Sequence, residues 1–200
     1  HLEQQLLPIS SWGTHYLAAR SEPRGGSVEV WRVVAHADGT TVDTTLPMHA
    51  RFTLNQGEYY EITTSDSFEV TASEPVMVAQ YLVSQTATQN NVGDPALIVV
   101  PPTDQLRSDY QIITPSGYTS NWVTITRQAG TRVSLDGADV PNSAFTSFGT
   151  GQYEYAWIGV EEGVHKLEGD ETFALIVYGY SAAVSYGYPG GLNLRSDESP

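Results

Sequence analysis

Ser181 has the surroundings closest to a catalytic motif. It lies in Gly179-Tyr180-Ser181-Ala182-Ala183, after an apolar stretch, as a nucleophilic serine does at the strand-to-helix turn of an α/β-hydrolase. That motif ends in glycine and its histidine comes later in the chain, but Ala183 takes the glycine position and no histidine follows Ser181. The next residues are rich in Tyr and Gly and do not form a helix. We therefore interpret Ser181 as the end of a strand, not as a nucleophile.

The histidines and carboxylates lack the spacing of a metal site or an acid/base pair. Neither H-x-H nor H-E-x-x-H occurs among the five histidines, which are His1, His15, His36, His49 and His165. Glu161-Glu162 falls at a predicted turn and indicates a solvated acidic rim, since glycosidase carboxylates need a fixed separation in space. The sequence predicts no catalytic residue and no cofactor. A loosely built calcium site between sandwich loops stays open as an alternative.

Tyrosines repeat at every second position in three stretches. Tyr153, Tyr155 and Trp157 share one predicted strand face, as do Tyr178 with Tyr180 and Tyr186 with Tyr188. Aligned tyrosines can form a platform that stacks on sugar rings or on a protein partner. The competing interpretation places the rings in the core or in cross-strand pairs, and we favour it for Trp157, Tyr178 and Tyr180. The candidate ligand contacts are Tyr153, Tyr155, Tyr186 and Tyr188.

The polar segment 84–94 interrupts the alternating pattern. It lacks periodicity and lies between two predicted strands, so it is either a linker or a loop that carries contacts. Its last residue, Asp94, joins the tyrosines as a candidate ligand contact.

Charge and composition exclude several functions. The chain has 200 residues, 9 Lys+Arg against 23 Asp+Glu, a formal charge of -14 and no cysteine. This charge repels phosphate backbones and anionic lipid, so we expect neither nucleic-acid binding nor membrane docking. Disulfides and thiolate metal sites are impossible. No apolar run reaches the length of a membrane span. The start lacks a signal-peptide pattern, so an exported protein of this sequence is expected to be a mature form or a piece of a longer chain.

The elements that must position these residues are strands. Apolar and polar residues alternate over 27–33, 58–63 and 132–136, and the apolar stretches 76–79 and 173–177 are short and β-branched. Gly-containing turns separate these stretches, and no amphipathic helix exceeds two turns. The sequence predicts an antiparallel all-β fold built from β-sandwiches.

The chain also repeats itself. A series of anchors recurs in the same order at offsets of 91 to 99 residues, as Pro8/Pro102, Tyr16/Tyr110, Trp31/Trp122, Gly39/Gly130, Val42/Val133, Leu54/Phe148, Gly57/Gly151, Tyr59/Tyr153 and Tyr81/Tyr180. Chance matching of common β residues is the alternative, but the shared order favours duplication. We predict two related, jelly-roll-like sandwich units packed together, over 1–97 and 98–194, and a polar tail at 195–200.

One ordered set of motifs runs through the second half of the chain. It comprises Val100-Pro101-Pro102-Thr103-Asp104-Gln105, Asp109-Tyr110-Gln111-Ile112-Ile113-Thr114-Pro115, Tyr118, Asn121-Trp122-Val123-Thr124-Ile125, Gly130-Thr131-Arg132-Val133 and Ser185-Tyr186-Gly187-Tyr188-Pro189. This set resembles the N-terminal domain of the IgGFc-binding protein family. The upstream half fits too, through Ala35-His36-Ala37-Asp38-Gly39. The resemblance covers nearly the whole chain and rests on the set of motifs together.

This resemblance implies an extracellular, non-enzymatic adhesion or binding module of a longer secreted or cell-surface protein. Its partner would be a glycan or a protein on another surface, with no insertion into a membrane. Animal mucin relatives are rich in disulfides, so the lack of cysteine favours a bacterial-type member. Two alternatives stay open, a structural spacer or assembly domain and, less favoured, a polysaccharide hydrolase with an acidic cleft.

Overall fold

The predicted alternation produces strands in the computed structural model, which describes residues 4–194. Residues 1–3 and the predicted tail at 195–200 lie outside the described residues. In Glu29–Ala35, for example, Trp31 and Val33 are buried while Arg32 between them is half-buried. The regular exchange of faces follows from the period of two in a strand. The antiparallel all-β fold with two packed sandwich units is confirmed.

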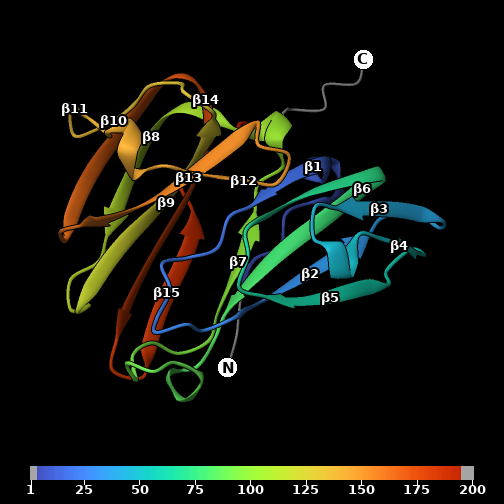
Figure 1. Ribbon diagram of the computed structural model, residues 1–200, viewed down its shortest axis with the longest axis horizontal. Helices are drawn as coiled ribbons and strands as arrows, with labels where there is room; N and C mark the ends of the chain where they lie inside the picture. Colours follow the sequence, from blue (N-terminus) through green and yellow to red (C-terminus); the bar gives the residue numbers. More distant parts are fainter. Residues whose placement is uncertain (1–3, 195–200) are drawn as a thin grey trace.

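Seven strands form the first antiparallel sheet, in the order β4-β3-β6-β2-β5 with β1 and β7 also paired to β6. We call this sheet and its loops unit 1 (Figure 1). Its strands are β1 (Gly13–Ala18), β2 (Glu29–Ala35), β3 (Thr40–Thr44), β4 (Arg51–Leu54), β5 (Tyr59–Thr64), β6 (Phe68–Leu82) and β7 (Ala96–Val100).

Eight strands form the second sheet, which we call unit 2. Its order is β11-β10-β14-β9-β13-β12, with β8 and β15 also paired to β14. Its strands are β8 (Arg107–Thr114), β9 (Ser120–Gln128), β10 (Val133–Leu135), β11 (Ala138–Asp139), β12 (Thr146–Phe148), β13 (Tyr153–Val160), β14 (Gly163–Ser181) and β15 (Val184–Pro189).

The helical segments within 4–194 are all single 3-10 turns in the connections. They are η1 (Ile9–Ser11), η2 (Pro47–His49), η3 (Gln85–Ala87), η4 (Thr103–Gln105) and η5 (Asn142–Ala144).

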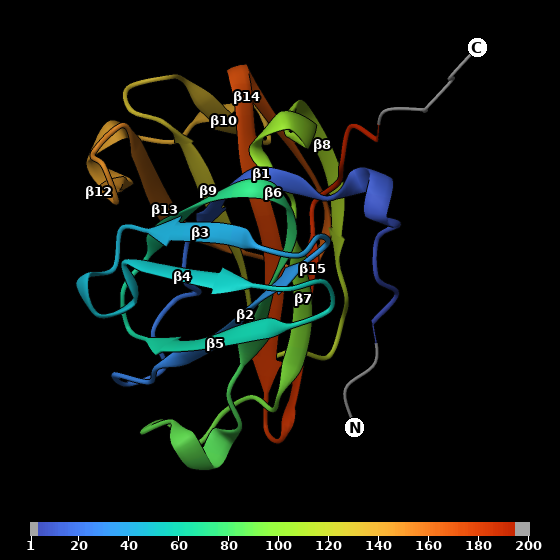
Figure 2. The same ribbon diagram turned by 90° about the vertical axis from the view of Figure 1, so that its right-hand side faces the viewer.

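One long bent strand joins the two layers of each unit. The first part of β6 pairs with β1 and β3, and its last part pairs with β2 and β7. Between the two parts the register shifts, because Gly13 faces Val76 while His15 faces Thr71. The corresponding shift in β14 lies between Glu168 and Phe173. Such irregularities bend a strand, so each sheet folds back on itself, and β14 runs the length of unit 2 (Figure 2).

A buried tyrosine secures each bend. The Tyr16 hydroxyl donates to the Val76 carbonyl oxygen and accepts a hydrogen bond from the Gly13 amide. The Tyr110 hydroxyl donates to the Phe173 carbonyl oxygen at 2.6 Å and accepts from the Arg107 amide at 2.9 Å. Burial raises the pKa of Tyr110 to about 12. We call this pair of interactions the tyrosine latch.

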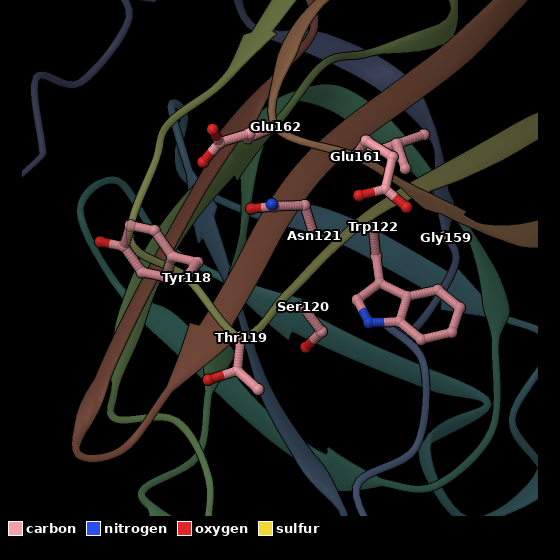
Figure 3. A pocket seen from close by; sticks show the side chains of 9 residues that line it. Tyr118, Thr119, Ser120, Asn121, Trp122, Gly159, Glu161 and Glu162 are labelled. Atoms are coloured by element: carbon pink, nitrogen blue, oxygen red, sulfur yellow. The ribbon is translucent and has the colours of Figure 1, made fainter.

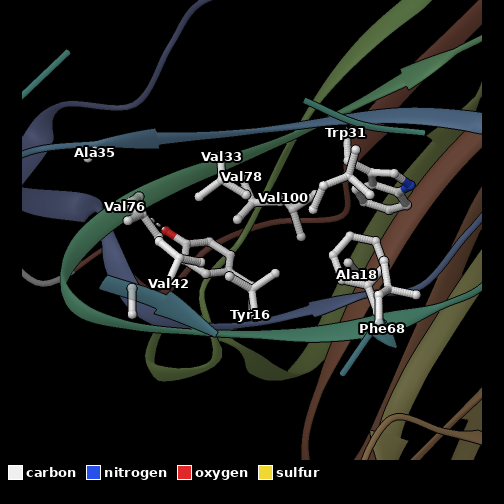
Figure 4. Close-up of a cluster of buried hydrophobic side chains, with 14 of the residues drawn as sticks. Tyr16, Ala18, Trp31, Val33, Ala35, Val42, Phe68, Val76, Val78 and Val100 are labelled. Carbon is white, nitrogen blue, oxygen red and sulfur yellow. Dashed lines mark hydrogen bonds between the residues drawn. The ribbon is translucent and has the colours of Figure 1, made fainter. Parts of the chain in front are cut away.

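Each unit has its own apolar core between its layers. Figure 4 shows the core of unit 1, where the Trp31 and Phe68 rings pack edge to face with centroids 5.4 Å apart. In unit 2 Val123, Ile125 and Leu175 occupy the corresponding space. Fully burying side chains of this size contributes about 1.5–3 kcal/mol each, so both units hold a core of their own.

The latches give a common origin from which the two units can be superposed strand by strand. Gln80 lies four residues after the Val76 latch carbonyl and faces Trp31, whereas Val177 lies four residues after Phe173 and faces Val123. Trp31 therefore corresponds to Val123, not to Trp122 as the sequence anchors indicate. A slip of one residue turns every side chain to the other face, and Trp122 accordingly packs outside the core of unit 2.

The predicted border between the units falls inside β7. That strand pairs with β6 from Leu82↔Ala96 to Val78↔Val100, so the first sheet continues past residue 97. Because β8 begins at Arg107, we propose that the border lies at 101–106 instead.

The two units meet through one aromatic face. The outer side of β9, β13 and β14 carries Tyr178 and Tyr180, which pack against Leu82 and Ile98 of unit 1. Gly187 on β15 permits this approach, since a Cβ there would lie 2.4 Å from the Ile98 side chain. The chain between β1 and β2 crosses this junction (Figure 1).

Candidate functional site

An open pocket of about 620 Å³ lies at one end of unit 2. One side comes from the loop between β8 and β9 and the start of β9, and the other from the end of β13 and the turn into β14. The pocket is lined by Tyr118, Thr119, Ser120, Asn121, Trp122, Gly159, Val160, Glu161 and Glu162. Figure 3 shows the Tyr118 ring and the Trp122 indole on opposite sides, with Asn121 between them. We call this site the β9-end pocket.

Strand register holds the Trp122 indole in place. Trp122 faces Gly159 on the neighbouring strand, and a Cβ at Gly159 would lie 3.7 Å from the indole. Because glycine has no side chain, the Trp122 ring lies directly beside the Gly159 backbone. Trp122 also packs partly against the junction cluster that contains Tyr178, so its position is fixed from the opposite side.

Three tyrosine rings form a ridge beside the pocket. Tyr118 packs edge to face on Tyr186 with centroids 4.7 Å apart, and Tyr186 stacks with Tyr188 at 6.1 Å. Pairs of aromatic rings at these separations attract each other beyond the apolar area that they bury. We call Tyr118, Tyr186 and Tyr188 the tyrosine ridge. Tyr186 and Tyr188 belong to the predicted site, whereas Tyr118 does not.

Hydrogen bonds orient the tyrosine ridge. The Tyr186 hydroxyl donates to Asn121 Oδ1 at 2.8 Å, and the Tyr188 hydroxyl donates to the Ile113 carbonyl oxygen and accepts from the Ile113 amide. Burial raises the pKa of Tyr188, with the Ile113 hydrogen bond opposing it. Both hydroxyls are therefore neutral donors at physiological pH, and the two rings are held before any ligand arrives.

Hydrogen bonds hold in place the turn that carries the acidic rim of the pocket, Glu161 and Glu162. The Glu161 carbonyl oxygen accepts hydrogen bonds from Thr114 Oγ1 at 2.6 Å and from His165 Nε2 at 2.9 Å. His165 Nδ1 lies 2.8 Å from Asp136 Oδ2. Burial lowers the pKa of His165, but the bonds to Asp136 and Glu161 outweigh it and raise the pKa overall. The Glu161 and Glu162 side chains are exposed, as the prediction of a solvated rim requires.

Two of the predicted tyrosines lie elsewhere, at the junction of the units. Tyr153 and Tyr155 are half-buried and pack on a cluster with Leu17 and Phe148. The cavity beside Tyr153 is only about 100 Å³. The shared strand face is as predicted, but unit 1 covers much of it. A ligand-binding role for Tyr153 and Tyr155 stays a prediction.

Asp94 also lies at the junction. Its amide donates to Ser185 Oγ at 2.7 Å, and the preceding Gly93 amide donates to the Ser181 carbonyl oxygen at 2.8 Å. The segment 84–94 is thus a loop in contact with unit 2, the second of the two predicted alternatives. These contacts involve the backbone of Asp94, so a ligand-binding role for its carboxylate stays a prediction.

The predicted burial is confirmed for Tyr178 and Tyr180, whereas Trp157 is half-buried. Tyr178 and Tyr180 are fully buried. Tyr178 accepts from the Glu22 amide at 2.8 Å, the Tyr180 hydroxyl donates to Ser21 Oγ at 3.1 Å, and Trp157 Nε1 donates to the Arg20 carbonyl oxygen at 2.7 Å. Loop 19–28 of unit 1 thus supplies the polar partners of the aromatic face, as buried hydroxyl and indole groups require.

The β9-end pocket has the chemistry of a binding site for a polar ligand. Aromatic rings offer stacking faces, Thr119 and Ser120 offer hydroxyl groups, and the rim offers carboxylates. Ser181 ends β14 with its hydroxyl 3.1 Å from Thr119 Oγ1, and the chain then turns directly into β15. Within residues 4–194, no three His, Asp or Glu side chains gather as a metal site would need, and no helix is long and apolar enough to cross a membrane.

Fold and pocket together define a two-unit all-β protein with an open pocket lined by aromatic and acidic residues. The family model described as IgGFc binding protein matches residues 1–179, and the chain belongs to this family. A curated relative, the IgGFc-binding protein of Homo sapiens, is 23% identical over 201 residues, which cover 93% of this chain and 4% of that protein. An anti-sigma factor domain-containing protein of known structure aligns over 92% of this chain and 83% of its own, at 12% identity and a TM-score of 0.23.

Sequence reasoning missed most of the pocket. Tyr118 and Trp122 entered only as motif residues, and Glu161 and Glu162 only as an acidic turn. Their side chains meet because β9 and β13 are antiparallel neighbours, with Asn121 facing Val160. The available signal was the short connection at 115–119, since the matching connection in unit 1 runs over 19–28. A shorter loop at an equivalent strand end exposes what the longer one covers.

Proposed function

We propose that the chain is an extracellular ligand-binding module of a larger secreted or cell-surface protein, and that the β9-end pocket with the tyrosine ridge is its binding surface. The observation that carries the proposal is the open pocket walled by Tyr118 and Trp122 and continued by rings already held by hydrogen bonds. Preorganised aromatic groups bind at low entropic cost.

Family membership supports this function. The family is named for binding, and its human relative bears the name IgGFc-binding protein. The matched stretch is only 4% of that relative, so antibody Fc is one ligand to test among others. An extracellular site of action, a longer parent chain and a non-enzymatic role follow from the same membership as proposals. The absence of cysteine supports the predicted bacterial-type origin.

Duplication of one sandwich unit is part of the proposal. Seven strands of each unit share one pattern of pairing, with β6 and β14 in the same central place, and each unit has a tyrosine latch. Independent origins would give no reason for such a match. After duplication the two copies took different roles. Unit 1 covers the aromatic face of unit 2, and unit 2 leaves its own strand end open.

The test is binding of the purified chain to a glycan array and to immobilised extracellular proteins, antibody Fc included. We expect Trp122→Ala and Tyr118→Ala to abolish binding of the ligand found. Tyr59→Ala is the matched control, because Tyr59 is 57% exposed on unit 1. A ligand that both pocket variants bind normally would place the site elsewhere. Failure to bind any ligand would favour the alternative role of an assembly domain.

A further inference from the structure

In unit 1 an arginine fills the place where unit 2 has the β9-end pocket. Arg20 follows the latch residue Tyr16 by four positions, and only 8% of its surface is exposed. Its guanidinium donates from Nη1 to the Ser65 carbonyl oxygen at 2.5 Å and from Nη2 to the Ser27 carbonyl oxygen at 2.8 Å. The guanidinium thus bridges the turn after β5 and the chain before β2.

Strand register identifies the matching positions in unit 2. Thr114 follows the latch residue Tyr110 by four positions, as Arg20 follows Tyr16. On the neighbouring strands Ile62 faces Trp31 and Ile158 faces Val123, so Ile62 corresponds to Ile158. Ser65 lies three residues after Ile62, and Glu161 lies three residues after Ile158. Ser65 therefore corresponds to Glu161. Ser27 lies four residues before Trp31 on β2, and Thr119 lies four residues before Val123 on β9. Ser27 therefore corresponds to Thr119. The two units therefore share the positions that surround the guanidinium.

The hydrogen bond at the first of these positions is present in both units. Thr114 Oγ1 donates to the Glu161 carbonyl oxygen at 2.6 Å, just as Arg20 donates to that of Ser65. The threonine side chain is short and ends there. In unit 1 the rest of the guanidinium occupies the space next to the position that corresponds to Thr119. In unit 2 this space belongs to the pocket, whose two sides carry Glu161 and Thr119.

The open pocket also carries groups that attract a cation. Glu161 and Glu162 bring two carboxylates where unit 1 has Ser65 and Asp66, and charge-assisted hydrogen bonds are about twice as strong as neutral ones. The Trp122 indole offers the best aromatic face for a cation. Guanidinium groups of this chain already use that contact, since Arg24 lies 4.3 Å from the Tyr180 ring centroid and Arg127 lies 3.4 Å from that of Phe145.

We propose that the β9-end pocket binds the guanidinium of an arginine side chain from a protein partner. The proposal rests on the proposed function and names the chemistry of its ligand. Arginine is favoured over lysine because a planar fork can reach a carbonyl oxygen and a carboxylate together and stack on an indole. The volume of about 620 Å³ leaves room for the residues that flank the arginine in an extended peptide. The charge of -14 favours approach of a basic segment.

The experiment follows the backbone amides and the Trp122 indole N–H by NMR while short capped peptides are added to the full chain. The peptides are Gly-Arg-Gly, Gly-Lys-Gly and Gly-citrulline-Gly, because citrulline keeps the shape of arginine without its charge. We expect the arginine peptide to shift the signals of Trp122, Thr119 and Glu161 in a saturable manner. Binding of the lysine and citrulline peptides should be at least about tenfold weaker, the effect of one charge-assisted hydrogen bond.

Matched variants assign the effect to the pocket. Glu161→Gln with Glu162→Gln should weaken the arginine peptide about tenfold, whereas Glu74→Gln, an exposed carboxylate on unit 1, should leave it unchanged. Thr114→Arg should place a guanidinium in the pocket from within and block the peptide. If that variant does not fold, the glutamine variants decide alone.

Three results would overturn the inference. One is equal affinity for the arginine and citrulline peptides, another is unchanged affinity in the double glutamine variant, and the third is no shift with any arginine peptide. If the array finds a glycan that Trp122→Ala no longer binds while no arginine peptide binds, this inference fails and the proposed function stands. If the array finds no ligand and the peptides do not bind, both fail.

Discussion

The two units of this protein close equivalent ends in different ways. In unit 1 loop 19–28 folds back over the strand ends, Arg20 bridges two carbonyl oxygens, and the surface continues into the junction. In unit 2 the connection at 115–119 is short, Thr114 reaches only the carbonyl oxygens of the turn at Glu161 and Gly163, and a pocket remains. Seven strands pair in the same pattern in both units, and unit 2 adds β12 at the edge beside β13. The open or closed state of this end therefore depends on loop length and on one side chain, on a shared framework of strands.

The outer faces of the two units show the opposite difference, because the outer face of unit 2 is the more deeply buried one. Tyr178 of unit 2 is buried under loop 19–28, whereas the corresponding Tyr81 of unit 1 is only half-buried, and Arg32 lies 5.0 Å from its ring centroid. Unit 2 thus exposes its strand end and buries its outer face, and unit 1 does the reverse. Each unit uses one of two equivalent surfaces to hold the pair together, and the other stays more accessible.

Replacing Arg20 by Met should have the largest effect on stability. Methionine keeps the apolar stem but removes the donors of the buried bond to the Ser27 carbonyl oxygen and of the partly buried bond to the Ser65 carbonyl oxygen. We expect the free energy of unfolding to fall by about 3 kcal/mol, since each unsatisfied buried group costs about 1–3 kcal/mol. Urea unfolding measures it. A loss below about 1 kcal/mol would mean that Arg20 does not close unit 1, and the comparison with the open pocket would collapse.

Tyr178→Phe and Tyr81→Phe compare the two outer faces directly. Phenylalanine at 178 removes the acceptor of the Glu22 amide and the partner of Thr124 Oγ1 at a fully buried position. We expect a loss of about 2 kcal/mol there and a change within about 0.5 kcal/mol at the half-buried Tyr81. Thermal unfolding of both variants provides the measurement. Equal losses would show that the junction does not depend on the Tyr178 hydroxyl.

Thr114→Val tests the smaller closure of unit 2. Valine has the shape of threonine and lacks only the hydroxyl that donates to the Glu161 carbonyl oxygen. His165 Nε2 still donates to the same oxygen, so we expect a loss of about 1 kcal/mol. The amide signals of Glu161 and Glu162 should broaden or shift as the turn loosens. Unchanged signals would mean that His165 alone fixes the rim.

Much of the fold follows from the sequence, because strands reveal themselves by alternation and the apolar stretches bury as expected. The burial of Tyr178 and Tyr180 was predictable from their place on an apolar strand. The register was not, since Trp31 and Trp122 match by residue type while the strands align Trp31 with Val123. The latch hydrogen bonds establish which residues of the two units correspond, and these bonds join residues far apart in the chain.

The pocket escaped prediction for a related reason. Its residues come from two turns whose side chains meet only after β9 and β13 pair, and a turn by itself carries no periodic signal. The predicted tyrosines divided accordingly. Tyr186 and Tyr188 lie on the terminal strand at the open end of unit 2, while Tyr153 and Tyr155 lie on the face that unit 1 covers. Alternation gave the shared face in each case, but which face meets the other unit depends on tertiary packing.

The smallest expected effect concerns a buried carboxylate that only unit 1 has. Glu29 is 2% exposed and accepts hydrogen bonds from the Ser21 amide and from Gln80 Nε2, while the corresponding residue of unit 2 is the neutral Asn121. Burial raises the pKa of Glu29 above its ordinary value of 4.5, against the hydrogen bonds of Ser21 and Gln80 and the charge of Arg20. The folded state therefore holds the proton more tightly than the unfolded state does.

Protonation of Glu29 consequently favours folding. The stabilisation that it brings is complete below the unfolded pKa and is lost as pH rises through the folded pKa. The free energy of unfolding should thus rise when pH falls from 7.5 toward 5, and Glu29→Gln, which gives unit 1 the neutral amide of unit 2, should reduce that rise. Glu74→Gln removes one charge at an exposed site and corrects for the general repulsion of an acidic chain. Urea unfolding at the two pH values measures the difference. If Glu29→Gln and Glu74→Gln give the same pH dependence, the buried carboxylate titrates as it does in the unfolded chain, and this difference between the units has no energetic consequence.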